Sequence, residues 1–527
     1  MLNFGELREK LKNKINEPKA QRKLVLVVVS IALLLDNMLY MVIVPIVPDY
    51  LNKTHALSSG GVLRWNDGSQ NRTINITRDM ENYEIKAEKY EIQWKAVASE
   101  DAKVGLLFAF KAIVQLFINP ISGTVIDRMG YDFPMMIGLC IIFLSTSVFA
   151  FGTTYKVMFI ARGLQGVGSA FADTAAFAMI ADRYQEDRET ALGVALAFVS
   201  FGCLVAPPFG GVLYEFCGKE FPFIILAFFA VFDGFLMLQI MKPVRLERMI
   251  SKAEGSDQNA TPIHKLFLDP YVAICAGALA FCNISLAFLE PTIALWMEKT
   301  MNATNWQVGL IWLPAFIPHV LGVYTTVKLG RIYPSKQWLM AAVGLTIVGV
   351  SCVFIPFCTN FISLMIPISL LCFGVALVDT AIFPTLAHIV DTRHVSIYGS
   401  VYAIADISYS LAYAIGPIVA GGLVKTIQFT GLNMMIFVMT VAYVPLLYPL
   451  RKVYSYHVKK TDEPIMEDEE KKEFEPVYQP ESKVHSGYDQ GDTESYEKNI
   501  SIPINNQGGY YYGGGDKRNL SNQANIY

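Results

Sequence analysis

Long apolar stretches alternate with short polar connections through most of this chain. Each of twelve stretches is long enough to cross a bilayer as a helix, which needs about 20 residues. We expect these helices at residues 24–48, 102–121, 133–152, 157–181, 190–213, 221–242, 270–298, 306–328, 337–357, 361–389, 395–424 and 430–450. The pattern therefore predicts an all-α membrane protein with twelve transmembrane helices in two six-helix halves.

Polar segments set the expected domain boundaries. The last segment is rich in charged residues, glycine and tyrosine and has too few apolar residues to build a core, so we expect it to be disordered. The predicted domains are a head (1–23), a first half (24–242) with a polar loop (51–101), a linker (243–269), a second half (270–450) and a disordered tail (451–527).

Basic residues are distributed unequally between the two sides of the predicted bundle. The head holds seven, the short connections on its side hold twelve, and those on the opposite side hold four. By the positive-inside bias, both termini are cytoplasmic. The loop at 51–101 then faces the lumen, and its three sequons, at Asn52, Asn71 and Asn75, are predicted glycosylation sites.

Composition narrows the functional classes. Hydrophobic residues make up 53% of the 527 residues and charged residues 17%, and the mean hydropathy is +0.37, which argues against a soluble enzyme. A net charge of −3 gives no reason to expect nucleic acid as a partner. The eight cysteines show no metal-binding spacing and no nucleotide-binding or catalytic motif is present, so we expect no enzyme activity, metal or cofactor.

Ionisable residues inside the predicted spans are the main chemical signal. They cost several kcal/mol in hydrocarbon and therefore face the bundle interior or a wet cavity. Six acids stand against two bases, a surplus that suits a cationic solute and exchangeable protons. These residues are Asp36, Lys111, Arg162, Asp173, Asp233, Glu290, Asp379 and Asp406, and His319 adds a group that titrates near neutral pH. Lys111 could equally be a structural ion-pair lock, and Asp233, close to a span end, is expected at the membrane interface.

Three motifs resemble those of the major facilitator superfamily. The first follows the second span, the next lies in the fourth span from Arg162 to Ala170, and the last resembles the antiporter motif of the fifth span, with Ala206 in place of its usual glycine. The resemblance implies two halves that rock between alternating-access states. Residues expected to gate this motion are Gly123, Asp127, Arg128, Gly130, Pro207, Gly210 and Gly211.

Four further strings resemble the vesicular amine transporters, which exchange acetylcholine or monoamines for protons. They run from Leu33 to Met38, Phe171 to Thr174, Phe288 to Pro291 and Tyr398 to Asp406. The serine cluster of the monoamine branch is replaced here by Gly152 and two threonines, and its lumenal cysteine pair is absent. These details favour the acetylcholine branch; a vesicular monoamine/proton antiporter and a drug/proton antiporter remain as alternatives.

The resemblance implies roles for individual residues. Asp379 is expected to hold the substrate cation, with Glu290 and Asn283 nearby. A quaternary ammonium is best held by aromatic faces beside a carboxylate. The expected aromatic cage is Tyr40, Trp312, Tyr324, Tyr402, Tyr409 and Tyr413, of which we expect about half to miss the site, and Asn37 and His319 complete the set. Proton coupling is assigned to a Lys111–Asp406 pair, with Asp36, Arg162 and Asp173.

The same resemblance implies a setting and partners. A multi-pass protein of the synaptic vesicle membrane would use the gradient made by the vesicle proton pump, with protons as its coupling ion. Vesamicol-like inhibitors are expected to bind, and sorting adaptors to recognise the cytoplasmic tail.

Overall fold

The computed structural model describes residues 18–44, 46, 50, 80–253, 261–303, 307 and 310–455, with residues 18–19, 80–104, 240–253, 295 and 455 as backbone alone. Nearly all of the predicted head, much of the lumenal loop with Asn52, Asn71 and Asn75, and the tail beyond residue 455 lie outside this part of the chain. The predictions of glycosylation and of a disordered tail therefore stay predictions.

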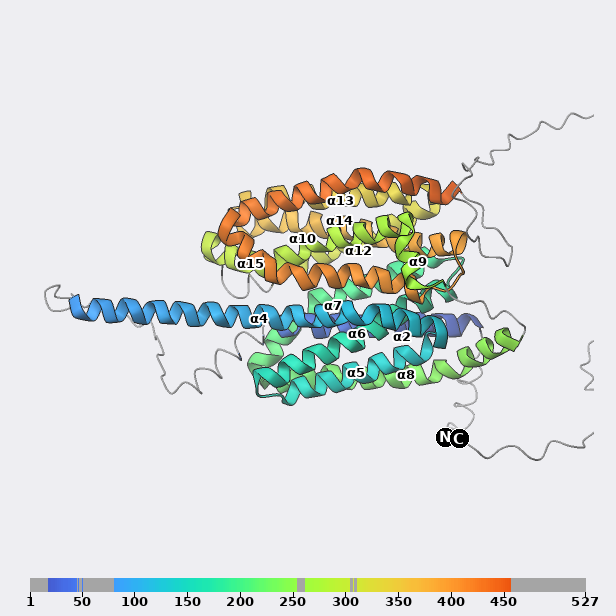
Figure 1. Cartoon of the computed structure of the whole chain (residues 1–527), viewed down its shortest axis with the longest axis horizontal. Coiled ribbons are helices and arrows are strands. Elements are labelled where there is room, and N and C mark those ends of the chain that lie inside the picture. Colours follow the sequence, from blue (N-terminus) through green and yellow to red (C-terminus); the bar gives the residue numbers. More distant parts are fainter. Residues whose placement is uncertain are drawn as a thin grey trace, which may run out of the picture. The chain divides into compact units, whose positions relative to one another are not determined.

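The described part of the chain is built from helices that run alongside one another (Figure 1). Those of the first half are α2 (Pro18–Met41), α4 (Met80–Met129), α5 (Asp132–Phe151), α6 (Tyr155–Arg183), α7 (Arg188–Cys217) and α8 (Glu220–Ala253). Those of the second half are α9 (Ile263–Leu268), α10 (Pro270–Met301), η1 (Leu313–Ala315), α12 (Phe316–Ile332), η2 (Pro334–Lys336), α13 (Gln337–Phe354), η3 (Ile355–Phe357), α14 (Phe361–Arg393), α15 (Gly399–Tyr443) and η4 (Val444–Ser455).

Nine helices in the described residues are long and apolar enough to cross a membrane. Two predicted spans fall short of that measure: α6 carries Arg162 and Asp173, which lower its hydropathy, and α12 is only 17 residues long. The last two predicted spans lie in one segment, from Gly399 to Tyr454, that bends at Gln428, where φ is 62°. The predicted all-helical class of membrane protein is confirmed.

Two helices are longer than the hydrophobic pattern predicts. α4 begins at Met80 rather than near residue 102, and α8 continues to Ala253 rather than ending near residue 242. Both extensions are rich in Glu, Lys, Arg and Ala, which have high helix propensity, so polar residues prolong the helices that apolar residues began.

Local signals end and start the helices at the short connections. α4 ends at Gly130, whose φ of 92° suits glycine. The Thr154 hydroxyl accepts a hydrogen bond from the Val157 amide and caps α6, and the Asp269 carboxylate accepts from the Tyr271 amide at 2.9 Å and caps α10.

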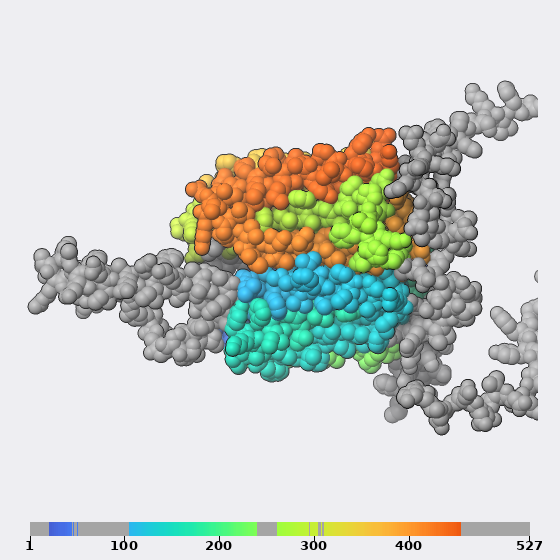
Figure 2. Space-filling model, viewed as in Figure 1, coloured from blue at the N-terminus to red at the C-terminus, as the bar shows by residue number. Residues whose placement is uncertain are grey.

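Close contacts between helices depend on small residues. Gly138 of α5 and Gly168 of α6 face each other, and a Cβ added at Gly138 would lie 2.6 Å from the Ala172 amide nitrogen. Across the two halves, α4 packs along α15, and Figure 2 shows their side chains in direct contact. A Cβ at Gly123 would lie 2.7 Å from the Ala403 Cβ, so the two backbones touch closely there.

Asp233 is not at an interface with water, and this prediction was wrong. Its side chain is fully buried in α8, and neither carboxylate oxygen has a hydrogen-bond partner among the described residues. Because α8 continues well past the predicted span end, Asp233 lies inside the helix, on the same buried face as Ala230 and Met237.

Candidate functional site

A buried ion pair lies at the centre of the first half. Lys111 of α4 donates to Asp36 of α2, with Nζ 2.7 Å from Oδ2, and both side chains are buried. The Ser169 hydroxyl of α6 donates to the other oxygen of Asp36 at 2.5 Å. Three helices of the first half thus meet at one carboxylate, and removing either charge would leave the other uncompensated.

The predicted Lys111–Asp406 pair is not the arrangement of this structure. Asp406 of α15 instead accepts a hydrogen bond from Gln115 Nε2 at 2.8 Å. Gln115 lies one turn after Lys111 on α4 and reaches across to the second half, while Lys111 points to the carboxylate within its own half. Lys111 and Asp406 still interact electrostatically.

Asp173 brings a third carboxylate to the same place. It lies on α6, is buried, interacts electrostatically with Asp36, Asp406 and Lys111, and has one oxygen, Oδ1, without a hydrogen-bond partner among the described residues. Lys111 and the nearby Arg162 carry two positive charges against three carboxylates. The surplus carboxylate offers a place for an exchangeable proton, and the coupling role of these residues stays a prediction.

The predicted cation-binding carboxylates occupy the second half. Asp379 of α14 is buried, interacts with Tyr409 of α15, and has one oxygen without a partner among the described residues. Glu290 of α10 accepts a hydrogen bond from the Tyr413 hydroxyl at 3.3 Å. Asn283 of α10 also interacts with Tyr409, and its side-chain amide donates to the Leu279 carbonyl at 2.8 Å. Each acid thus has a tyrosine beside it.

Tyr40 of α2 joins the two groups of residues. Its ring meets Tyr413 edge to face, with 5.7 Å between centroids, and the cationic ends of Lys111 and Arg162 lie 5.4 and 5.0 Å from its centroid. Tyr40, Glu290 and Tyr413 are each only partly buried. Tyr40, Tyr413 and Glu290 therefore lie together where the two halves meet.

His319 also lies at this junction. Its Nε2 is 2.5 Å from the Ser200 hydroxyl of α7, and its Nδ1 is 3.1 Å from the Cys372 carbonyl oxygen of α14. A carbonyl only accepts, so Nδ1 carries a proton. His319 bridges the halves as a hydrogen-bonded side chain of α12.

Other members of the predicted aromatic set lie elsewhere. Tyr324 is 61% exposed, on the same outward face of α12 as Ile317 and Leu321, which suits contact with lipid. Tyr402 is buried against Phe177 and Phe383, and its hydroxyl donates to the Phe383 carbonyl, as a packing residue would. Trp312 precedes η1 and is partly buried, and Asn37 donates to the Leu33 carbonyl of its own helix at 2.8 Å.

The end assigned to the cytoplasm is closed by contacts between the halves. In the gating motif, Asp127 accepts from the Ser400 amide at 3.0 Å and from its hydroxyl, at the first turn of α15, where amides lack helical partners. Asp127 thus bonds across the halves, and Arg128 beside it is exposed.

Gly210 of α7 lies against Val42, so the antiporter motif packs on the segment that follows α2.

A second set of closing residues was missed by the sequence analysis. Arg188 of α7 donates to Asp391 of α14 at 2.7 Å and to the Tyr398 hydroxyl at 3.0 Å, and Tyr398 donates to Asp391 at 2.5 Å. An exposed pair, Asp187–Arg331, lies beside them. The signal that could have found them is the run of charges at the cytoplasmic helix ends, which we used only to assign orientation.

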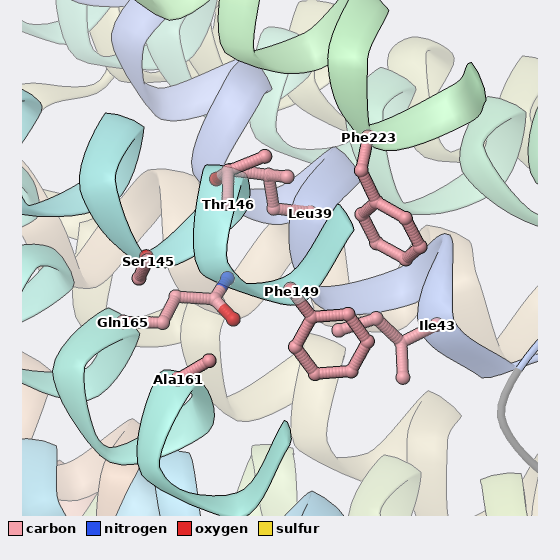
Figure 3. A pocket seen from close by; sticks show the side chains of 8 residues that line it. All are labelled: Leu39, Ile43, Ser145, Thr146, Phe149, Ala161, Gln165 and Phe223. Carbon is pink, nitrogen blue, oxygen red and sulfur yellow. The ribbon is translucent and has the colours of Figure 1, made fainter. Parts of the chain in front are cut away.

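A small cavity lies inside the first half, beside Gln165, to which Arg162 donates a hydrogen bond. Figure 3 shows the side chains of Leu39, Ile43, Ser145, Thr146, Phe149, Ala161, Gln165 and Phe223 around it. It has about 10 Å³ of space for the centre of a water molecule, which is room for one water and not for an organic cation.

Comparison with known proteins finds relatives that all belong to one family of transporters. The family model described as Major Facilitator Superfamily matches residues 26–405. The chain is 53% identical to the vesicular acetylcholine transporter of Drosophila melanogaster (92% of this chain, 82% of the relative), 50% identical to that of Torpedo torpedo (96% and 96%) and 52% identical to that of Rattus norvegicus (86% and 88%).

Solved structures agree on the fold. The human organic anion transporter MFSD10 superposes with a TM-score of 0.60 at 16% identity, covering 81% of this chain and 99% of that one. The proton:xylose symporter XylE gives a TM-score of 0.59 at 13% identity, covering 83% and 99%. These similarities show the fold alone.

Proposed function

Because this chain belongs to the vesicular acetylcholine transporters of the Major Facilitator Superfamily, we propose that it loads acetylcholine into acidic vesicles in exchange for protons. It is a multi-pass membrane protein. Its relatives match most of the chain and are transporters, which agrees with the prediction that it is not an enzyme. The alternatives of a monoamine or a drug antiporter lose support, since relatives at about half identity carry the acetylcholine name.

The two carboxylates of the second half support a cationic substrate, and this observation carries the proposal. Asp379 keeps an oxygen free of partners among the described residues, and Glu290 is bonded only through a tyrosine hydroxyl. Buried carboxylates without a basic partner gain from a cation, and tyrosine faces add about 0.5–2 kcal/mol each to its binding. Asp379, Glu290, Tyr409 and Tyr413 are the proposed substrate residues.

The cluster of the first half supports proton coupling. Protonation of Asp36 from an acidic lumen would weaken its pair with Lys111, whose charge then acts on Asp406 of the second half. Arg162 lies at the edge of this cluster and Asp173 within it. Proton binding in one half is thereby linked to the contacts with the other.

Alternating access connects these two sites. Asp127 and Arg188 close the end that we assign to the cytoplasm, and proton loading favours the opening of this end. Protons then leave to the cytoplasm, acetylcholine binds the vacated acids, and the halves rock back to release it. The gating glycines and Pro207 belong to the helices that move.

The setting of the protein follows from the same proposal. The synaptic vesicle membrane, with both termini cytoplasmic, places it beside the proton pump that supplies the gradient. Vesamicol-like inhibitors are proposed to bind it, and sorting adaptors to bind the tail.

Uptake of labelled acetylcholine by acidified vesicles that contain the protein tests the proposal, with serotonin in parallel and a proton uncoupler as control. We expect uncoupler-sensitive uptake of acetylcholine alone, abolished in Asp379→Asn and unchanged in Asp187→Asn, which alters an exposed carboxylate. Serotonin uptake alone would move the chain to the monoamine branch, and normal uptake by Asp379→Asn would remove Asp379 from the site.

A further inference from the structure

Arg162 is a fully buried cation that makes no ion pair with a carboxylate of the described residues. Its side chain is inaccessible to solvent, and its one hydrogen bond in the described structure runs from Nη1 to Gln165 Oε1 at 2.6 Å. Nε and Nη2 are buried and have no partner among the described residues. Asp36 acts on Arg162 through its charge, but the hydrogen bonds of its oxygens go to Lys111 and Ser169.

Aromatic faces stand in for the missing carboxylate. The guanidinium carbon lies 5.0 Å from the centroid of Tyr40 and 5.7 Å from that of Phe108. Such distances allow a cation–π attraction, which strengthens when the cation is desolvated. Arg162 is thus held by the face of Tyr40 together with its hydrogen bond to Gln165.

Tyr40 is part of the group that suits a quaternary ammonium. It meets Tyr413 edge to face, and Tyr413 donates to Glu290, so two rings connect Arg162 in the first half with a carboxylate in the second. Tyr40, Tyr413 and Glu290 are each only partly buried. Arg162 therefore occupies an aromatic face next to the proposed substrate site.

We propose that Arg162 is a built-in competitor of the substrate: its guanidinium and the substrate's quaternary ammonium take turns on the Tyr40 face. This inference rests on the proposed function and deepens it. The ends of Lys111 and Arg162 both lie at the Tyr40 ring, and Lys111 is paired with Asp36, so Arg162 is the one of the two without a bonded carboxylate among the described residues. A further cation at this ring meets strong repulsion from Arg162 at low dielectric. Arg162 on Tyr40 therefore expels the bound ammonium in the state described here, and its withdrawal opens the face to the next substrate molecule.

Equilibrium binding of labelled acetylcholine to the purified full chain tests this role. Arg162→Gln removes the charge while keeping an amide for Gln165, and we expect about tenfold tighter binding, the size of one cation–π contact. In the uptake assay, both the KM and the maximal rate of Arg162→Gln should fall, because the variant releases acetylcholine more slowly. Arg162→Lys keeps the charge and serves as the matched control, with affinity within about threefold of the wild type.

A second variant separates competition from a general change in charge. Adding Tyr40→Leu to Arg162→Gln should remove the gain in affinity, since the contested ring is gone. Equal gains with and without Tyr40, or unchanged or weaker binding in Arg162→Gln, would overturn the proposal. If acetylcholine does not bind the wild type, the proposed function fails instead.

Folding is checked by thermal unfolding of Arg162→Gln and of Arg162→Met. Replacing a buried charge by a neutral side chain of similar volume is commonly neutral or stabilising, so we expect both variants to melt at or above the wild-type temperature. Loss of folding in both would make Arg162 a structural residue and would also overturn the proposal.

Discussion

The buried contact of Arg188 with Asp391 should set how often the cytoplasmic end opens. The side chains are 9% and 20% exposed, and Tyr398 completes their hydrogen bonds. Removing one charge from a buried pair costs about 3–5 kcal/mol, and the partial exposure of Asp391 lowers this to about 2–3 kcal/mol. Asp391→Asn should therefore raise the ratio of open to closed molecules by about 30- to 150-fold.

Alkylation of a cysteine between the halves measures this ratio. Val323 of α12 is 6% exposed and faces Gly193 of α7, so Val323→Cys should react with a charged maleimide only when the halves part. The exposed Cys140 and Cys217 are first replaced by alanine. Asp187→Asn is the matched control, since its pair with Arg331 is more than half exposed and worth about 0–1 kcal/mol. Equal labelling rates in Asp391→Asn and Asp187→Asn would refute the reasoning.

Two further predictions concern stability in detergent, followed by thermal unfolding. Burial raises the pKa of Asp269, but the hydrogen bond from His394 and the charge of Arg393 outweigh it and lower that pKa to about 2. The ionised Asp269 side chain then stabilises the fold fully above the unfolded-state pKa of about 3.9, and this stabilisation is lost as the pH falls towards 2. The difference in melting temperature between the wild type and Asp269→Asn should therefore shrink below pH 4. A difference that stays constant with pH would contradict this prediction. Gly138→Ala should lower the free energy of unfolding by about 2 kcal/mol, because the added Cβ meets the backbone of α6. Gly234→Ala is the control: a Cβ there has nothing within 4 Å, so this variant should be neutral or more stable. Equal melting temperatures for the two variants would show that α5 and α6 can separate.

The spans and the gating motif could be predicted because hydropathy and glycine spacing are local properties of the sequence. The partner of Lys111 could not, because Asp36 and Asp406 are both compatible with its position in the chain. The choice depends on how α4 is rotated and on where Ser169 adds a second hydrogen bond. Composition limits which residues can pair, and helix orientation selects among them.

The aromatic residues illustrate the same limit. Tyr40 and Tyr413 meet at the junction of the halves, while Tyr324 faces outward on α12. All lie in apolar spans, so the sequence alone ranks them equally. Asp233 shows the related error for burial, since the end of α8 is set by polar helix formers that hydropathy does not score.

The contact of Gly123 with Ala403 bears on how fast the transporter can cycle. Every closure must order the side chains that meet, and long side chains lose up to about 2 kcal/mol of rotamer entropy each, whereas glycine and alanine lose none. Gly123, Gly399 and Ala403 meet where α4 approaches α15. Docking at this place therefore has to order only a few side chains, chiefly Asp127 and Ser400 of the closing contact, and this small entropy cost favours rapid, repeatable turnover.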